Sequence, residues 1–115
     1  MALHHATPGE IIDIRPLGEQ LSCAITATLL KSEHLQVFRL ILPEGKEFHE
    51  HHVPGEITVQ CLEGEVEFTA SGKNQLLTAG DLLYLDGGEP HALKGVTHAS
   101  VLVTVFLQPK NAQVA

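Results

Sequence analysis

The feature that most constrains this fold is a series of short apolar or alternating runs, separated by turns that contain glycine or proline. About ten such runs follow one another along the chain, rich in β-branched and other apolar residues. No window of eleven or more residues shows the 3.6-residue period of an amphipathic helix. This pattern predicts an all-β domain, a sandwich or a barrel of about ten short antiparallel strands with little or no helix.

The turns delimit each expected strand. The run at residues 35–42 is apolar on both faces, as is typical of a strand that is covered on both sides. Residues 1–115 are predicted to form a single domain, with 1–10 as a loose lead-in and 108–115 as a polar tail. Strands are expected at residues 11–14, 23–30, 35–42, 46–53, 66–70, 75–78, 82–85, 91–93 and 100–107, with a further strand between the Pro54-Gly55 turn and Gly64.

Charge narrows the classes of partner. The net charge of −7 argues against nucleic acid or an anionic membrane. Seven of the fourteen acidic residues lie between Glu44 and Glu67, where their field favours a cation over an anion. The N-terminus lacks the basic and apolar regions of a signal peptide, and no stretch approaches the length of a membrane span, so a cytoplasmic protein is expected. Cys23 and Cys61 both lie in apolar runs and are predicted to be buried free thiols.

Residues 45–64 carry the densest group of histidines: His49, His51 and His52. If residues 46–53 form a strand, His49 and His51 share a face, because successive side chains alternate sides. A hairpin centred on Pro54-Gly55 would then place Thr58 opposite His51 and Gln60 opposite His49. A bulge would break this register, and a shifted register would exchange His52 for His51.

Two segments resemble the two motifs of the cupin family. The first is Gly45, then His49-x-His51, then Leu62-Glu63-Gly64, and the second is Gly80-Asp81 followed by Pro90-His91. The resemblance implies a small double-sheet jelly roll, or double-stranded β-helix, which agrees with the number of expected strands.

The resemblance also implies a metal site. His49, His51 and His91 would bind a divalent transition metal in the barrel, with Gln60 or Glu56 as a fourth ligand. The family's usual glutamate, seven positions before the closing glycine of the first motif, is replaced here by Ile57. Imidazole ligands suit zinc, iron, nickel, manganese and copper alike, so the identity of the metal stays open. The alternative is that these histidines are solvated loop residues in a cupin without metal.

The functional expectation is a metal-binding small cupin that acts on a small organic molecule. A redox-active metal would suit dioxygenase-like chemistry, and a redox-silent metal would suit isomerase-like or lyase-like chemistry. The alternative is a non-catalytic cupin, with or without metal, that binds or senses a small molecule. Whether the protein is an enzyme therefore stays open. A homodimer is expected, in which N-terminal strands or sheet edges are covered by the partner.

Overall fold

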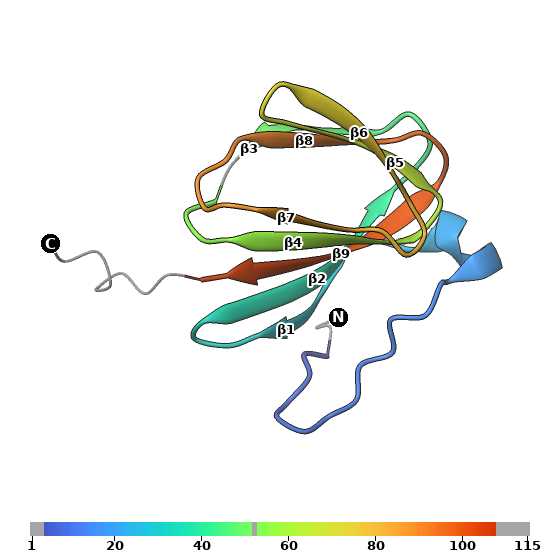
Figure 1. Ribbon diagram of the computed structural model, residues 1–115. Helices are drawn as coiled ribbons and strands as arrows, with labels where there is room; N and C mark the ends of the chain where they lie inside the picture. The colour runs from blue at the N-terminus through green and yellow to red at the C-terminus, as the bar shows by residue number, and fades with distance from the viewer. Residues whose placement is uncertain (1–3, 52, 108–115) are drawn as a thin grey trace, which may run out of the picture.

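The computed structural model describes residues 4–51 and 53–107, except for the side chains of Glu50 and His51. This part of the chain contains one 3₁₀ helix, η1, and nine strands, which Figure 1 shows as arrows. The elements are η1 (Gly18–Cys23), β1 (Ala27–Lys31), β2 (Leu35–Leu42), β3 (Glu47–His51), β4 (Ile57–Glu63), β5 (Glu65–Ala70), β6 (Lys73–Thr78), β7 (Leu82–Leu85), β8 (His91–Gly95) and β9 (Ala99–Phe106).

The strands form two antiparallel sheets that face each other (Figure 1). One sheet has five strands in the order β1-β2-β9-β4-β7, and the other has four in the order β3-β8-β5-β6. Neighbours in each sheet are often far apart in sequence, as in a jelly roll. The predicted all-β double-sheet fold is confirmed. Across the described residues, no helix is long and apolar enough to span a membrane.

The core fills the space between the sheets. In β4 the residues alternate between buried and half-buried, and Ile57, Val59 and Cys61 point inward. Strands β2 and β9 pair without a bulge from Leu35 opposite Phe106 to Leu42 opposite Ala99. This regular ladder aligns the inward residues of both strands in successive layers along the barrel.

The predicted first strand, residues 11–14, is wrong. These residues form no strand in the structure, and the Ile11 side chain is 92% exposed. The backbone N–H and the side chain of Arg15 both donate to the carboxylate of Asp13, at 2.9 and 3.0 Å. This apolar sequence lies outside both sheets, and a local side-chain contact to the backbone occupies its end.

The strand expected at residues 23–30 begins later than predicted, because Cys23 ends the 3₁₀ helix η1 and β1 starts at Ala27. Cys23 is exposed, so its predicted burial is wrong, whereas Cys61 is buried and free as predicted. Burial raises the pKa of the Cys61 thiol. This thiol therefore behaves as a small apolar core residue.

Glu63, from the first motif, anchors the N-terminal segment to the outer face of the five-stranded sheet. Its carboxylate accepts hydrogen bonds from the backbone N–H groups of Leu17 and Gly18 at 3.0–3.1 Å and from the Ser100 hydroxyl at 2.7 Å. The buried guanidinium of Arg39 lies 3.8 Å from the same carboxylate and donates to the carbonyl of Arg15 at 3.1 Å. These contacts hold a segment that belongs to neither sheet.

The position of Glu63 depends on a bulge and a glycine. The register shifts between Cys61 and Glu63, so that Cys61 stays inside while Glu63 pairs with Ser100, whose hydroxyl it binds on the outer side. Gly64 follows with φ +80°, and a Cβ there would lie 2.1 Å from the His98 carbonyl oxygen. Only glycine fits this position, which explains the end of the first motif.

Candidate ligand-binding cavity

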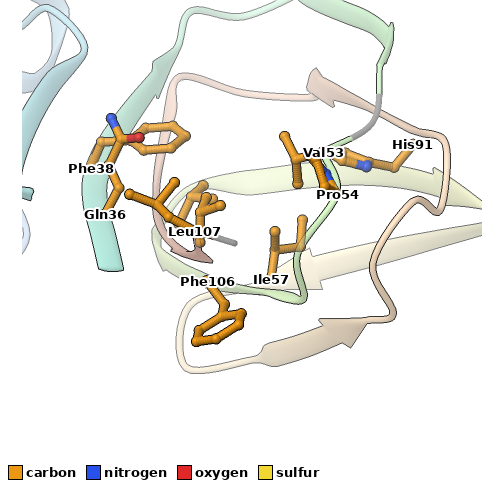
Figure 2. Close-up of a pocket in the computed structure, with 10 residues that line it drawn as sticks. Gln36, Phe38, Val53, Pro54, Ile57, His91, Phe106 and Leu107 are labelled. Carbon is orange, nitrogen blue, oxygen red and sulfur yellow. The ribbon is translucent and has the colours of Figure 1, made fainter. Parts of the chain in front are cut away.

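One end of the barrel is hollow. A cavity of about 270 Å³ opens there, and a smaller hollow of about 110 Å³ lies against many of the same residues. Phe38, Ile57, His91 and Val103 line both spaces. The larger cavity is lined by Gln36, Phe38, Val53, Pro54, Ile57, His91, Val103, Val105, Phe106 and Leu107, most of which Figure 2 labels.

The described residues of the lining are almost entirely apolar. Eight of the ten residues are aliphatic, aromatic or proline, and none carries a formal charge apart from a protonated histidine. Gln36 and His91 are the two polar side chains in the set. Such a lining, with few polar groups among apolar walls, is typical of small-molecule sites.

His91, from the second motif, is the buried polar residue of the cavity, with 4% exposure. It begins β8 directly after Pro90, and its ring stacks on Phe68 with centroids 5.7 Å apart and planes 6° apart. Its Nδ1 lies 3.1 Å from the carbonyl oxygen of Glu89. Because a carbonyl oxygen can only accept, Nδ1 carries the proton of this contact, and Nε2 is the acceptor nitrogen of the neutral ring.

The rim of the cavity is fixed by backbone contacts that join the loop between β3 and β4 to the loop before β8 and to the end of β9. The N–H of Gly88 donates to the carbonyl of Val53 at 2.7 Å, and the N–H of Phe106 donates to the carbonyl of Glu56 at 2.9 Å. A Cβ on Gly87 would lie 2.1 Å from the carbonyl oxygen of Pro54. Glycine at this position lets the loop before His91 pack closely on the Val53-Pro54 segment.

The predicted hairpin between the histidine strand and the next strand is wrong. Strand β3 pairs with β8, whereas β4 pairs with β7 and β9 in the other sheet. Thr58 therefore lies opposite Tyr84 and Thr104, and Gln60 lies opposite Leu82 and Leu102. The Pro54-Gly55 turn carries the chain from one sheet to the other, so it does not join neighbouring strands.

The structure brings the backbones of His51 and His91 together. They are paired residues across β3 and β8, next to the pair formed by Phe48 and Leu93. Between these pairs β3 has two residues where β8 has one, which is a β-bulge. The bulge puts the His51 position in register with His91. The His51 side chain and the whole of His52 lie outside the described residues.

His49 is not brought to the cavity. It lies in the bulge of β3, and its side chain is 90% exposed, with Nδ1 3.8 Å from the Glu47 carboxylate. The prediction that His49 and His51 share a face assumed a regular strand. The bulge breaks that alternation, as a two-against-one register must.

Gln60 and Glu56 are not brought to His91 either. Gln60 alternates with the inward-facing Val59 and Cys61, and is therefore on the outer face of β4. Glu56 is exposed and accepts a hydrogen bond of 2.6 Å from the Tyr84 hydroxyl, which also lies 2.7 Å from Asp86. These two hydrogen bonds raise the pKa of the Tyr84 phenol, which stays protonated on the outer surface.

The described donors do not by themselves fit a divalent metal. Of the predicted ligands, only His91 has a described side chain in the cavity, and Ile57 forms an apolar wall where the family usually has glutamate. No group of three or more His, Cys, Asp or Glu side chains in the described part of the chain could hold a metal ion. A metal here would depend on the residues at 51 and 52.

Sequence reasoning missed Gln36 and Phe38 as cavity residues. Both belong to the run at 35–42, which the sequence predicts to be apolar on both faces, and both alternate with outward positions of β2. The available signal was the parity of Gln36, which matches that of the buried Leu40 and Leu42. A polar residue at an inward position of a core strand indicates a site.

Comparison with known protein families agrees with the double-sheet fold. A family model described as "Cupin domain" matches residues 38–106. No curated protein matches the chain. The match covers the core strands from β2 to β9, including both motifs and most of the cavity lining.

Several solved structures are similar over most of the chain. A conserved protein of unknown function from Streptococcus pyogenes is 23% identical, with a TM-score of 0.71, covering 94% of this chain and 98% of that one. A predicted oxalate decarboxylase from Thermotoga maritima is 28% identical, with a TM-score of 0.65 and coverage of 72% and 79%. KdgF from Halomonas sp. is 12% identical, with a TM-score of 0.67 and coverage of 75% and 82%.

Proposed function

We propose that this chain, which belongs to the cupin family, binds a small organic molecule in the cavity at the open end of its barrel. The observation that carries the proposal is the cavity of about 270 Å³, in which His91 is buried in a wall whose other described residues are apolar except for Gln36. The Glu89 carbonyl oxygen accepts a hydrogen bond from Nδ1 of His91 and thereby orients the imidazole in the cavity wall, where its ring would contact the ligand.

The apolar lining supplies affinity and His91 supplies orientation. Burial of apolar ligand surface is favourable by about 25 cal/mol per Å². The stack on Phe68 and the hydrogen bond to Glu89 restrain the imidazole, so little side-chain entropy is lost on binding. Cupin neighbours include a predicted oxalate decarboxylase, which is consistent with a small oxygenated ligand but leaves turnover open.

A screen of small neutral molecules by ligand-observed NMR tests the proposal. We expect bound fragments whose affinity falls about tenfold in His91→Ala, from the loss of the contact with the imidazole ring. Val105→Phe, which fills the cavity, should abolish their binding, whereas Leu76→Phe on the exposed face of β6 should not. Fragments that bind all folded variants equally, or no fragments at all, would exclude this cavity as the site.

A second candidate function is a metal-assisted reaction in the same cavity. The register of β3 favours it, because His51 occupies the position opposite His91, and paired positions have Cβ atoms about 4.5–5.5 Å apart. Two imidazoles at that spacing are suitable ligands for zinc, iron, nickel, manganese or copper. When bound, such a metal would polarise an oxygen of the substrate or, if redox-active, support oxidation.

Metal content of untagged protein separates the two candidates. For the metal site, we expect near-stoichiometric metal by mass spectrometry, lost in His51→Ala and in His91→Ala. His49→Ala is the matched control, because that side chain is 90% exposed. Absence of metal after incubation with each ion, together with fragment binding, would leave the cavity as a metal-free binding site.

We also propose that the chain forms a homodimer through the outer face of the five-stranded sheet. Leu82 and Tyr84 on the edge strand β7 are 65% and 55% exposed, and Phe106 on β9 is 46% exposed. A second copy would cover this apolar strip and the open edge of β7. Sedimentation should give a dimer for the wild type and a monomer for Leu82→Glu; a monomer mass at all wild-type concentrations would refute the proposal.

A further inference from the structure

Two segments at the open end of the barrel meet mainly through their backbones. Residues 53–56 precede β4 and residues 86–88 follow β7, and the two loops lie side by side at the left end of the barrel in Figure 1. The Gly88 N–H donates to the Val53 carbonyl at 2.7 Å, and the glycine before it packs directly on the backbone of the other segment. Such a junction buries little apolar surface, so its stability depends mainly on hydrogen bonds.

Two facing carboxylates oppose this junction. Strands β4 and β7 pair as far as Ile57 opposite Leu85, and the next positions along the two chains are Glu56 and Asp86. Like charges at directly opposed positions of an antiparallel pair are destabilising. The ladder ends where these two residues begin, and repulsion between their carboxylates favours separation of the two segments.

The Tyr84 hydroxyl lies between the two carboxylates. It is 2.6 Å from the Glu56 carboxylate and 2.7 Å from that of Asp86. Both contacts raise the pKa of the phenol, which therefore keeps its single proton and donates it to one carboxylate oxygen at a time. The contact with Asp86 is local, two residues along the same chain segment. The contact with Glu56 joins the two segments.

We propose that the hydrogen bond from Tyr84 to Glu56 is a latch that holds residues 53–56 against residues 86–88 and slows the entry and exit of a ligand. Val53 and Pro54 connect the latch to the cavity, because both line it (Figure 2). Tyr84 is thus a positioning residue that acts through residues 53–56. Control of ligand exchange rests on the proposed function, whereas the latch itself can be measured without a ligand.

Hydrogen exchange of two backbone amides measures the latch. The Gly88 N–H donates to the Val53 carbonyl and the Phe106 N–H donates to the Glu56 carbonyl, so both amides lose protection when residues 53–56 move away. Tyr84→Phe keeps the ring and removes the hydroxyl. It should accelerate exchange of both amides about threefold to tenfold, because one hydrogen bond is lost and two like charges then face each other without a donor.

A rescue variant separates the latch from a general loss of structure. The amide of Asp86→Asn is uncharged and can donate to Glu56, so in the Tyr84→Phe background it should return exchange to within about twofold of the wild type. Loss of a dimer contact of Tyr84 would not be rescued in this way. Thr58→Val is the matched control, because it removes a hydroxyl opposite Tyr84 and leaves both carboxylates unchanged. It should change exchange less than about twofold.

Fluorobenzene tests whether the latch controls the cavity, since it is an apolar probe and most of the described lining is apolar. Its rates of binding and release are measured by fluorine NMR exchange spectroscopy. Tyr84→Phe should raise both rates about threefold to tenfold, in proportion to the population of the open rim. The dissociation constant should change less than about twofold, because the latch is closed in both the free and the bound protein.

The outcomes separate the latch from the proposed function. Unchanged amide exchange in Tyr84→Phe, or faster exchange that Asp86→Asn does not rescue, refutes the latch whatever the cavity binds. Faster amide exchange with unchanged fluorobenzene rates refutes the control of ligand exchange and leaves the cavity as a binding site. A wild type that does not bind fluorobenzene refutes that control for this probe. If all screened fragments fail as well, the proposed function fails, while amide exchange still decides the latch.

Discussion

The two ends of the barrel are built from the same strands but differ in packing. At the closed end Leu42, Cys61, Val66, Ala99 and Val101 all have 0% exposure. At the open end, two to six residues further along these strands, Val103 and Val105 rise to 6% and 8%, and the space beside them is a cavity. One sheet pair thus provides both a rigid core and a site.

The difference follows from what each end contains. The closed end is filled by aliphatic side chains, and the Glu63 carboxylate closes its outer side by holding the N-terminal segment. The open end has a histidine and a glutamine at inward positions and loops in place of a further packed layer. Stability should therefore depend mainly on the closed end, and binding on the open end.

The largest expected effect is at Glu63. Glu63→Ala should lower the free energy of unfolding by about 3 kcal/mol, because it leaves a buried guanidinium and several donors without their acceptor. Chemical denaturation measures the loss, and hydrogen exchange should show Leu17 and Gly18 losing protection. Glu67→Ala on β5 is the control and should change stability by less than about 0.5 kcal/mol. Equal losses at both positions would contradict the closed-end anchor.

A matched pair of valines compares the two ends within one strand. Val101 and Val105 both point inward from β9, one at the packed end and the other beside the cavity. Val101→Ala should cost about 2 kcal/mol, from lost transfer free energy and a new cavity. Val105→Ala should cost about 1 kcal/mol or less, because fewer atoms contact its methyl groups. Urea denaturation of both variants measures the two losses of stability. Equal losses would mean that the open end is packed as tightly as the closed end.

Acid should destabilise the closed end by protonating the Glu63 carboxylate. Burial raises the pKa of this carboxyl, but hydrogen bonds from Leu17, Ser100 and Gly18 and the charge of Arg39 outweigh it, so the pKa lies below its ordinary range. A lowered folded-state pKa contributes stability above the ordinary value and loses it as the pH falls through the folded value. The stability difference between wild type and Glu63→Gln should therefore shrink from neutral pH to about pH 3. A constant difference would argue against this linkage.

Much of the fold could be predicted from the sequence because turns delimit the strands. Strands β2 and β7 have the expected bounds, Leu35–Leu42 and Leu82–Leu85, since glycine, proline or polar turns flank both runs. The pairing of the strands was harder to predict. The Pro54-Gly55 turn looks like a hairpin, but β3 and β4 pair with strands distant in sequence. Pairing of that kind depends on the whole core and not on local residues.

Of the described residues that line the candidate cavity, His91 is the one that the sequence motifs single out. The second motif placed His91 at the start of a strand, where the structure has it buried in the cavity wall. The bulge in β3 changes the alternation at His49 without a clear sequence signal. Gln60 was placed beside the histidines by a hairpin that does not form, because β4 pairs with β7 and β9 in the other sheet. Metal binding by His49, His51, Gln60 and His91 as one set stays a prediction, to which the described geometry contributes His91 and the register position of His51.

The smallest effects are expected for two side chains outside the barrel interior, those of His49 and Gln60. His49→Ala and Gln60→Ala should each change stability by less than about 0.5 kcal/mol and leave fragment affinity in the cavity unchanged, because one side chain is 90% exposed and the other is on the outer face of β4. Urea denaturation and NMR titration measure the two quantities on the same samples. His91→Ala is the positive control for lost binding. Loss of affinity in Gln60→Ala would mean that binding occurs outside the cavity, and loss in His49→Ala would mean that the bulge of β3 rearranges to turn this imidazole inward.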